Sequence, residues 1–225
     1  MNSLSWPFDR VQAVAGNGYR EKCLTMRQVK VSQTRTMTLP QAAATLPHPG
    51  KTVAQICLAS WLIALAAQIT VPMSVVPMSM QSMAVLAVGL CLSPRRALAS
   101  VLAYLGQGAL GLPVFAGAMG GMVHLMGPRA GYLWLYPVLV YALATAWRSR
   151  WAQRWVDCGT LHAVVLSAGL LLPAVIVLLL GGAAWLSMFT GVKVALFIGV
   201  APFIGLELAK IGCLALMVGC ARHSR

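Results

Sequence analysis

YLGQGALGLPVFAGAMGGMVHLMGPRAGY, residues 104–132, is the stretch that decides the fold of this 225-residue chain. It lies between two long apolar runs, yet it is rich in glycine and carries two prolines and an arginine. Glycine and proline favour turns and close backbone approach over helix interiors. Irregular backbone at membrane depth is tolerated only where protein buries it or where it lines a cavity. The stretch therefore predicts a loop folded into a membrane protein, where it lines or covers a site; the plainer alternative is a connector between two spans.

The chain as a whole has the composition of a polytopic membrane protein. Hydrophobic residues make up 59% of the sequence and charged residues 9%, with a mean hydropathy of +0.78, whereas a soluble domain is about 25% charged. The formal net charge of +13 does not predict a nucleic-acid partner, because no nucleic-acid-binding motif accompanies it. The basic residues instead cluster between apolar runs, as membrane topology requires, so membrane lipid is the expected surrounding.

Six apolar runs predict an all-α membrane protein, a bundle of six transmembrane helices with the Gly-rich loop folded in on its outer side. Residues 51–225 form this membrane domain, whereas residues 1–50 are polar and basic and are predicted to be a disordered cytoplasmic tail. Several runs are shorter than the roughly 20 residues of an upright span, so we expect apolar loops to fill the remaining depth. A second irregular outer segment is expected to begin at Gly181 and Gly182. The six runs cover residues 53–71, 79–92, 97–112, 131–147, 158–180 and 203–221.

The distribution of Lys and Arg predicts the orientation of these spans. Fourteen of the seventeen fall in the N-terminal tail, in residues 93–96, in a loop at residues 148–154 or in the C-terminal tail. These four segments share one side of the membrane if there are six spans, and basic segments stay in the cytoplasm. Both termini are therefore predicted to be cytoplasmic and the Gly-rich loop to face outward. The exceptions are Arg129, Lys193 and Lys210.

One pair of opposite charges lies in the last apolar run. Glu207 and Lys210 are three residues apart and so share one face of a helix. A lone charge in a span costs about 2.5–3.5 kcal/mol on insertion scales, so each charge needs a partner. One interpretation is a salt bridge that staples the bundle. The other, which we favour, is a ligand-binding pair, because intramembrane charges usually face a site.

A third charged candidate lies in the GPRAGY block, residues 127–132. Arg129 is either an interfacial arginine that reaches toward headgroups or a group that binds a carboxylate at the mouth of a pocket. Tyr132 beside it fits either an interfacial aromatic belt or a pocket wall.

No other motif predicts catalysis, a cofactor or a metal. The six cysteines form no CxxC and no pairing framework, and His162 has no second ligand at helical spacing. There is no GxSxG motif and no nucleophile with a base in reach. There is also no Walker motif, so any ATP must be hydrolysed by another chain. We therefore expect no enzyme and no cofactor; an intramembrane hydrolase and a structural scaffold are the less favoured alternatives.

Four blocks of the sequence resemble BioY, the biotin-specific S-component family of energy-coupling-factor (ECF) vitamin transporters. They are QITVP (68–72), VPMSMQSMAVLAVGL (76–90), SPRRALASVLAYLGQGALGLPVFAGAMGG (93–121) and GPRAGYL (127–133). The resemblance extends over residues 53–221. It implies a six-helix protein of the bacterial cytoplasmic membrane that binds biotin from outside; an S-component for another vitamin is the alternative.

The resemblance also implies partners for the chain. S-components of this family dock on an ECF transmembrane T-component with ATPase subunits. The docking surface is a small-xxx-small pattern on the first helix, which Ser60 and Ala64 match here. The pattern is a generic one for close helix packing.

The family resemblance further implies where the ligand binds. The final helix of the family carries an acid and a lysine three residues apart; the match here is Glu207 and Lys210, with glutamate in place of the usual aspartate. GPRAGY replaces a commoner GPTGGY, so no role for Arg129 is inherited. A biotin site needs a mostly apolar cavity with a few fixed polar groups. We expect the pair near one end of biotin and Arg129 at the other. The predicted ligand-binding residues are Glu207, Lys210, Arg129, Tyr132, Phe115, Gly117 and Gly121.

Overall fold

The computed structural model describes residues 49–71 and 78–223. The chain divides into two units, Met1–Pro47 and His48–Arg225, and the described residues all belong to the second unit. The predicted tail therefore lies outside the described residues, apart from its last two positions, which begin the first described helix.

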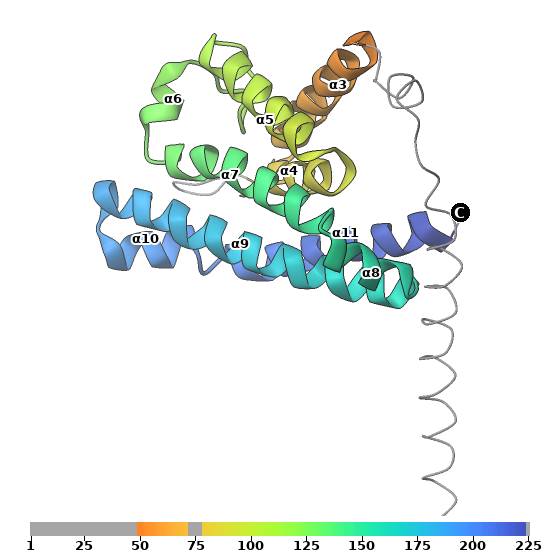
Figure 1. The fold of residues 1–225 in the computed structure, drawn as a ribbon. Helices are drawn as coiled ribbons and strands as arrows, with labels where there is room; N and C mark the ends of the chain where they lie inside the picture. The colour runs from red at the N-terminus through yellow and green to blue at the C-terminus, as the bar shows by residue number, and fades with distance from the viewer. Residues whose placement is uncertain (1–48, 72–77, 224–225) are drawn as a thin grey trace, which may run out of the picture. The chain divides into compact units, whose positions relative to one another are not determined.

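Helices make up most of the described fold. One short antiparallel ladder accompanies them, in which Thr70 pairs with Ser79 and Val71 with Met78. The elements in chain order are α3 (Pro49–Gln68), β1 (Thr70–Val71), β2 (Met78–Ser79), α4 (Gln81–Cys91), α5 (Pro94–Ala109), α6 (Met122–Met126), α7 (Ala130–Trp147), α8 (Arg150–Asp157), α9 (Thr160–Thr190), α10 (Val192–Gly199) and α11 (Phe203–His223) (Figure 1).

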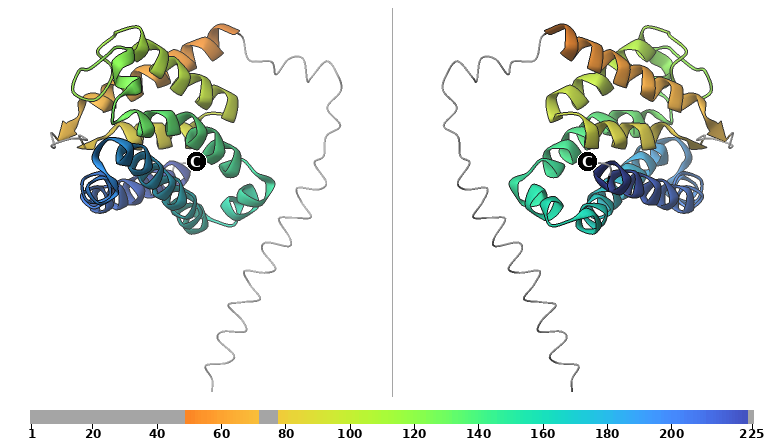
Figure 2. Two further views of the ribbon diagram at one scale, coloured as in Figure 1. Left: turned by 90° about the vertical axis from the view of Figure 1, so that its left-hand side faces the viewer. Right: turned by 90° about the vertical axis from the view of Figure 1, so that its right-hand side faces the viewer.

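Helix α7 lies at the centre of the described helices. It packs against α4 and α5 on one side and against α9 on the other, while α3 packs on α5 and α11 packs on α9 (Figure 1). Figure 2 shows the same arrangement from two sides, with α3 and α5 on one side of α7 and α9 and α11 on the other. Fully buried side chains join these layers, among them Ile63, Tyr104, Val140 and Leu171.

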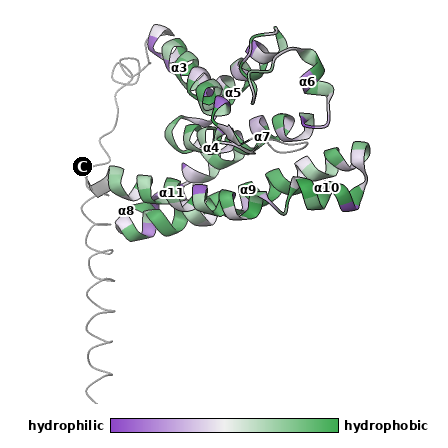
Figure 3. Ribbon diagram, turned by 180° about the vertical axis from the view of Figure 1, so that it is seen from behind, coloured by the Kyte–Doolittle hydropathy of each residue, from purple (hydrophilic) through white to green (hydrophobic). Residues whose placement is uncertain are grey.

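The surfaces of these helices are apolar. Among the described residues, four helices are long and apolar enough to cross a membrane: α3, α7, α9 and α11. Hydrophobic residues cover them on most sides (Figure 3), as expected for helices that face lipid. Helix α4 is only 11 residues long, and α5 has 16 residues and carries Arg95 and Arg96 in its first turn. The prediction of a multi-pass membrane protein built from helices is matched, with four of the six expected spans found among the described residues by length and composition.

The prediction of an irregular segment at Gly181 and Gly182 is wrong. Helix α9 continues through both residues to Thr190 and ends at Gly191, whose φ of 81° belongs to the left-handed region. A Cβ at Gly182 would collide with the ring of Tyr132, and one at Gly181 would collide with Leu135. The two glycines therefore allow α9 to approach α7 closely, and do not form a turn.

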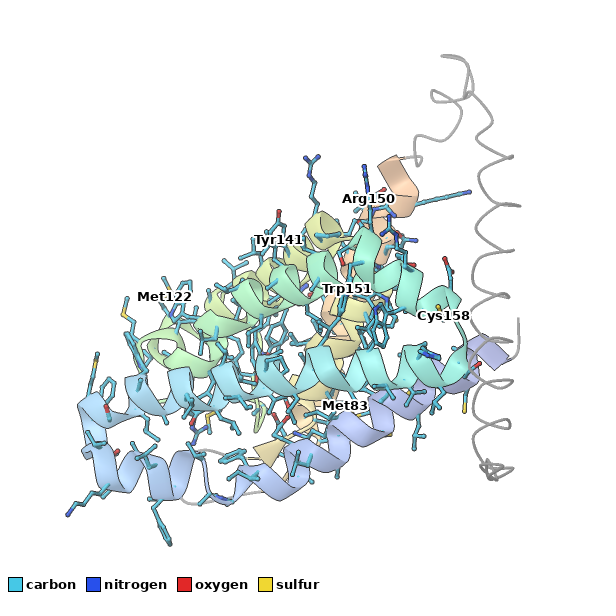
Figure 4. The ribbon with its side chains drawn as sticks, turned by 60° about the horizontal axis from the view of Figure 1, so that its bottom comes forward. Met83, Met122, Tyr141, Arg150, Trp151 and Cys158 are labelled. Atoms are coloured by element: carbon cyan, nitrogen blue, oxygen red, sulfur yellow. The ribbon has the colours of Figure 1, made fainter. Side chains whose placement is uncertain are left out.

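The basic loop expected at residues 148–154 is also corrected by the structure. It contains the start of α8, whose N-cap is the Ser149 side chain, accepting a hydrogen bond from the Ala152 N–H at 3.2 Å. Ala152 and Val156, four residues apart, are buried against α9. Arg150 and Trp151, labelled in Figure 4, begin this helix on its exposed side. The two small apolar positions give the segment the face that it needs to pack as a helix.

Candidate ligand-binding site

The Gly-rich stretch between α5 and α6 folds back on itself in a tight turn. Phe115 and Met119 exchange backbone hydrogen bonds of 2.9 and 3.3 Å. Gly117 and Ala118 between them have φ values of 80° and 56°, a conformation that costs energy for a residue with a Cβ. The Phe115 ring packs edge-to-face on Tyr104, at 5.7 Å between centroids, and directly over Gly108, where a Cβ would collide with it.

This turn forms one wall of a pocket. Residues of α4, α6, α7, α9 and α11 form the other walls, so the pocket lies where the two layers of helices meet. The lining residues are Ser79, Gln81, Ser82, Phe115, Ala116, Met119, His124, Arg129, Tyr132, Leu133, Tyr136, Leu178, Leu179, Phe203 and Glu207. Most of them are apolar or aromatic, and the few polar groups are those that a ligand could bind.

Glu207 and Lys210 form a buried ion pair beside this pocket. The Lys210 Nζ donates to Glu207 Oε1 at 2.7 Å, to the Ser79 carbonyl at 2.7 Å and to Ser82 Oγ at 2.9 Å. Ser82 Oγ in turn donates to Glu207 Oε1 at 2.8 Å. An ammonium group has three hydrogens, so these three acceptors take every hydrogen bond that Lys210 can donate. The ammonium also orients the Glu207 carboxylate.

Two buried polar atoms remain without a hydrogen-bond partner among the described residues: Glu207 Oε2 and Gln81 Nε2. Their residues are 4% and 3% exposed, and both line the pocket. Leaving such a group unpaired costs about 1–3 kcal/mol, and more for a charged one. One is an acceptor and the other a donor, so the pocket has the polar groups to bind a ligand that carries both an N–H and a carbonyl oxygen. A salt-bridge staple alone does not account for them.

The structure brings four of the seven predicted ligand-binding residues to the pocket: Glu207, Arg129, Tyr132 and Phe115. The Tyr132 hydroxyl donates to the Gly199 carbonyl at 2.9 Å, so this ring is fixed as a wall. Arg129 Nη1 lies 3.5 Å from the Met119 sulfur, which is a weak acceptor.

The other three predicted residues do not line the pocket. Lys210 binds Glu207 Oε1 and does not itself reach the pocket surface. Gly117 and Gly121 have φ values of 80° and 99° and so shape the turn and the start of α6. Their part in the site is to set the backbone path.

Several pocket residues were not predicted from the sequence. Gln81 and Ser82 are the first two residues of α4, whose other residues are apolar or glycine. Two polar residues at the start of such a helix could have identified them as site candidates. Tyr136 lies one helical turn beyond Tyr132 on α7, and this spacing could have found it. His124 of α6 lines the pocket as well.

The two residues predicted to dock a partner are buried inside the chain. Ser60 is fully buried and donates to Gln107 Oε1 of α5 at 3.1 Å, and Ala64 is 5% exposed. The small residues of α3 thus accommodate α5. In this structure the exposed face of α3 carries larger side chains such as Trp61 and Leu65.

Comparison with known proteins assigns the chain to a family. The profile of the BioY family matches residues 35–224. The chain belongs to the BioY family. The resemblance found in the four sequence blocks is thereby confirmed. "Probable biotin transporter BioY" of Pyrococcus horikoshii is 34% identical over 160 residues, covering 71% of this chain and 89% of the relative. "Biotin transporter BioY2" of Lactococcus lactis is 32% identical over 158 residues, covering 69% and 81%.

A solved structure of the same fold accompanies these BioY relatives. The S-component for biotin from an ECF-type ABC transporter superposes with a TM-score of 0.60 at 23% identity. The match covers 84% of this chain and 95% of that one. The relatives are named as transporters, and family membership places this chain with them and not with enzymes.

Proposed function

We propose that this chain is the substrate-binding membrane subunit of an ECF-type transporter and that it captures biotin for uptake. The observation that carries the proposal is a pair of buried atoms, Glu207 Oε2 and Gln81 Nε2, that have no hydrogen-bond partner among the described residues and belong to the lining of a mostly apolar pocket. Biotin carries a ureido group, whose N–H groups donate and whose carbonyl accepts, on an apolar bicyclic ring. BioY membership supports the same ligand.

The pocket offers a place for each part of biotin. A ureido N–H would donate to Glu207 Oε2, and the ureido oxygen would accept from Gln81 Nε2. The fused ring and the aliphatic tail would lie against apolar side chains such as Leu133, Leu178 and Phe203. The carboxylate would meet Arg129, whose guanidinium binds such groups bidentately.

Lys210 has an indirect role in this proposal. Its three hydrogen bonds hold Glu207 Oε1, so the second carboxylate oxygen is left for the ligand. The pair is thus both a salt bridge and part of a binding site. Neither of the two original interpretations excludes the other.

The proposed setting is the bacterial cytoplasmic membrane, with six spans and both termini in the cytoplasm. Helices α4 and α5 would complete the six, and the Gly-rich turn would cover the pocket from outside. A T-component and two ATPase subunits would supply the energy, because this chain contains no Walker motif. The named relative, an S-component of an ECF-type ABC transporter, supports this assembly.

Equilibrium binding to the purified protein in detergent tests the proposed ligand. Labelled biotin should bind to one site, unlabelled biotin should displace it, and equal concentrations of riboflavin or thiamine should not. Displacement by another vitamin, with no saturable binding of biotin, would assign the chain to a different substrate.

A further inference from the structure

Gln68, the last residue of α3, forms several hydrogen bonds with the turn that lines the pocket and with the residue just before it. Its side-chain nitrogen lies 3.3 Å from the carbonyls of Pro113 and Phe115, and 3.3 Å from the Ala64 carbonyl of its own helix. Its side-chain oxygen accepts from the Ala118 N–H at 3.0 Å. One glutamine therefore contacts both sides of the turn.

The base and the tip of this loop are held differently. The base is fixed by a 2.7 Å bond from the Gly121 N–H to the Gly108 carbonyl and by the Tyr104 hydroxyl on Val114. The tip of the loop is residues 116–118. Among the described residues, the tip makes one hydrogen bond to another element, from the Ala118 N–H to Gln68. Ala118 is also the residue that takes a left-handed φ of 56°, so the tip needs an external partner to stay in this conformation.

The same end of α3 also positions the polar wall of the pocket. The Ile69 carbonyl, next to Gln68, accepts from the Met80 N–H at 3.0 Å. Met80 immediately precedes Gln81, whose buried side-chain nitrogen has no hydrogen-bond partner among the residues that the structure describes. The end of α3 thus touches the turn through a side chain and the start of α4 through the backbone.

We propose that Gln68 is a positioning residue that latches the 115–119 turn against α3 and thereby sets the rate at which the ligand leaves the pocket. Phe115, Ala116 and Met119 of the turn line the pocket, so the turn must stay in place for the ligand to be enclosed. Gln68 is exposed at the end of α3, so its bonds to the turn are not locked in the core, which suits a latch that has to open. The proposal rests on the proposed function, because biotin is the ligand whose release is measured.

Dissociation kinetics provide the first test. Gln68→Met keeps the length and volume of the side chain and removes its hydrogen bonds with Phe115 and Ala118 of the turn and with the Pro113 carbonyl that precedes it. Gln107→Met is the matched control, since it removes a glutamine that joins α5 to α3 through Ser60 and does not touch the turn. Labelled biotin should leave Gln68→Met about tenfold faster than wild type or more, the size expected for losing one or more hydrogen bonds, and should leave Gln107→Met within about twofold of it. Equal rates for Gln68→Met and wild type would overturn the proposal.

Hydrogen exchange of the ligand-free proteins provides a second test that does not depend on biotin. The segment 113–121 should exchange faster in Gln68→Met than in wild type, because the Ala118 amide loses its acceptor, and should be unchanged in Gln107→Met. Unchanged exchange in Gln68→Met would show that no latch exists. Faster exchange with unchanged biotin dissociation would show that the turn does not control release, and would also overturn the proposal. If wild type does not bind biotin at all, the proposed function fails, while the exchange result still decides whether Gln68 holds the turn.

Discussion

At the scale of single residues, Lys210 and Glu207 have separate tasks. Lys210 donates all of its hydrogens to protein acceptors, whereas one oxygen of Glu207 has no hydrogen-bond partner in the part of the chain that the structure describes. A buried charge that is paired on one side and open on the other is expensive in the empty protein. Such an arrangement is typical of a site that becomes fully satisfied only when its ligand is bound.

Gln81 gives the first prediction, because its side-chain nitrogen is buried and has no hydrogen-bond partner within residues 49–71 and 78–223. Gln81→Met should stabilise the ligand-free protein by about 1 kcal/mol, since removing an unsatisfied donor removes its desolvation cost. The same change should weaken biotin binding by about 1 kcal/mol through the lost hydrogen bond. Thermal unfolding in detergent and biotin titration measure the two effects. Gln107→Met, which removes a satisfied glutamine, should lower stability and leave affinity unchanged; the same pattern in Gln81→Met would rule out a ligand role.

Arg129 gives the second prediction, which concerns the other end of the ligand. Arg129→Gln should weaken biotin binding by about 1.5–3 kcal/mol, the range for a hydrogen bond to a charged group. Binding of biotin methyl ester, which has no carboxylate, should be almost unchanged. Titrations of both ligands with both proteins form a double-mutant cycle. If the ester and the acid lose affinity equally, Arg129 does not meet the carboxylate.

At the scale of elements, the glycines of α9 decide how closely it packs on α7. Gly169 and Gly182 both lie inside α9, but their surroundings differ. A Cβ at Gly169 would meet nothing within 4 Å, whereas one at Gly182 would enter the Tyr132 ring. Tyr132 lines the pocket, and its hydroxyl donates a hydrogen bond to the Gly199 carbonyl. The residue that packs on Gly182 of α9 is therefore also a wall of the pocket.

This contrast gives the third prediction. Gly182→Ala should destabilise the protein by about 1–3 kcal/mol, as overpacking of a close contact does, and should weaken biotin binding because Tyr132 is displaced. Gly169→Ala should leave binding unchanged and be neutral or slightly stabilising, since Ala is a better helix former than Gly by about 1 kcal/mol. Thermal unfolding and biotin titration of the two variants measure this difference. Equal behaviour of the two variants would contradict the packing role assigned to Gly182.

The elements also show what the sequence could and could not reveal. Two helices match their predicted bounds to within two residues, 131–147 against Ala130–Trp147 and 79–92 against Gln81–Cys91, whereas α3 and α5 lie three to four residues earlier in the chain than predicted. The continuation of α9 was not predicted, because the partner that makes Gly182 a packing residue is Tyr132, fifty positions earlier in the chain. A local pattern of two glycines resembles a turn in either case.

The same limit applies to the pocket. Glu207 and Arg129 are conspicuous in the sequence as charges within apolar segments, and both lie at the pocket. Gln81 and Ser82 are ordinary polar residues until the fold places them opposite α11. The task of Lys210 also depends on Ser79 and Ser82, two acceptors of another segment that its three-residue spacing from Glu207 does not reveal.

At the scale of the whole molecule, orientation in the membrane is the fourth prediction. Fourteen of seventeen basic residues fall in segments that share one side if there are six spans, and such segments stay in the cytoplasm. A reporter fused after Arg225 should therefore be cytoplasmic, and one fused within residues 117–121 should be external. Reporters on the same side would contradict the six-span arrangement.

The central proposal is that Glu207, held by Lys210, binds biotin in this pocket. The double variant Glu207→Gln with Lys210→Met keeps side-chain volume and leaves no unpaired buried ion. Replacing a buried ion pair in this way is often neutral or stabilising, so the ligand-free protein should unfold at a temperature close to that of wild type. Its folded state can then be compared directly with wild type for binding.

The decisive measurement is therefore the biotin dissociation constant of this double variant beside that of wild type. Binding should weaken by about 2–5 kcal/mol, the usual cost of truncating a buried hydrogen-bonded charge at an interface; at about 1.4 kcal/mol per decade, the upper end exceeds a thousandfold. A stable double variant that binds biotin within about threefold of wild type would show that the pair only staples helices together, and would contradict the site proposed for this protein.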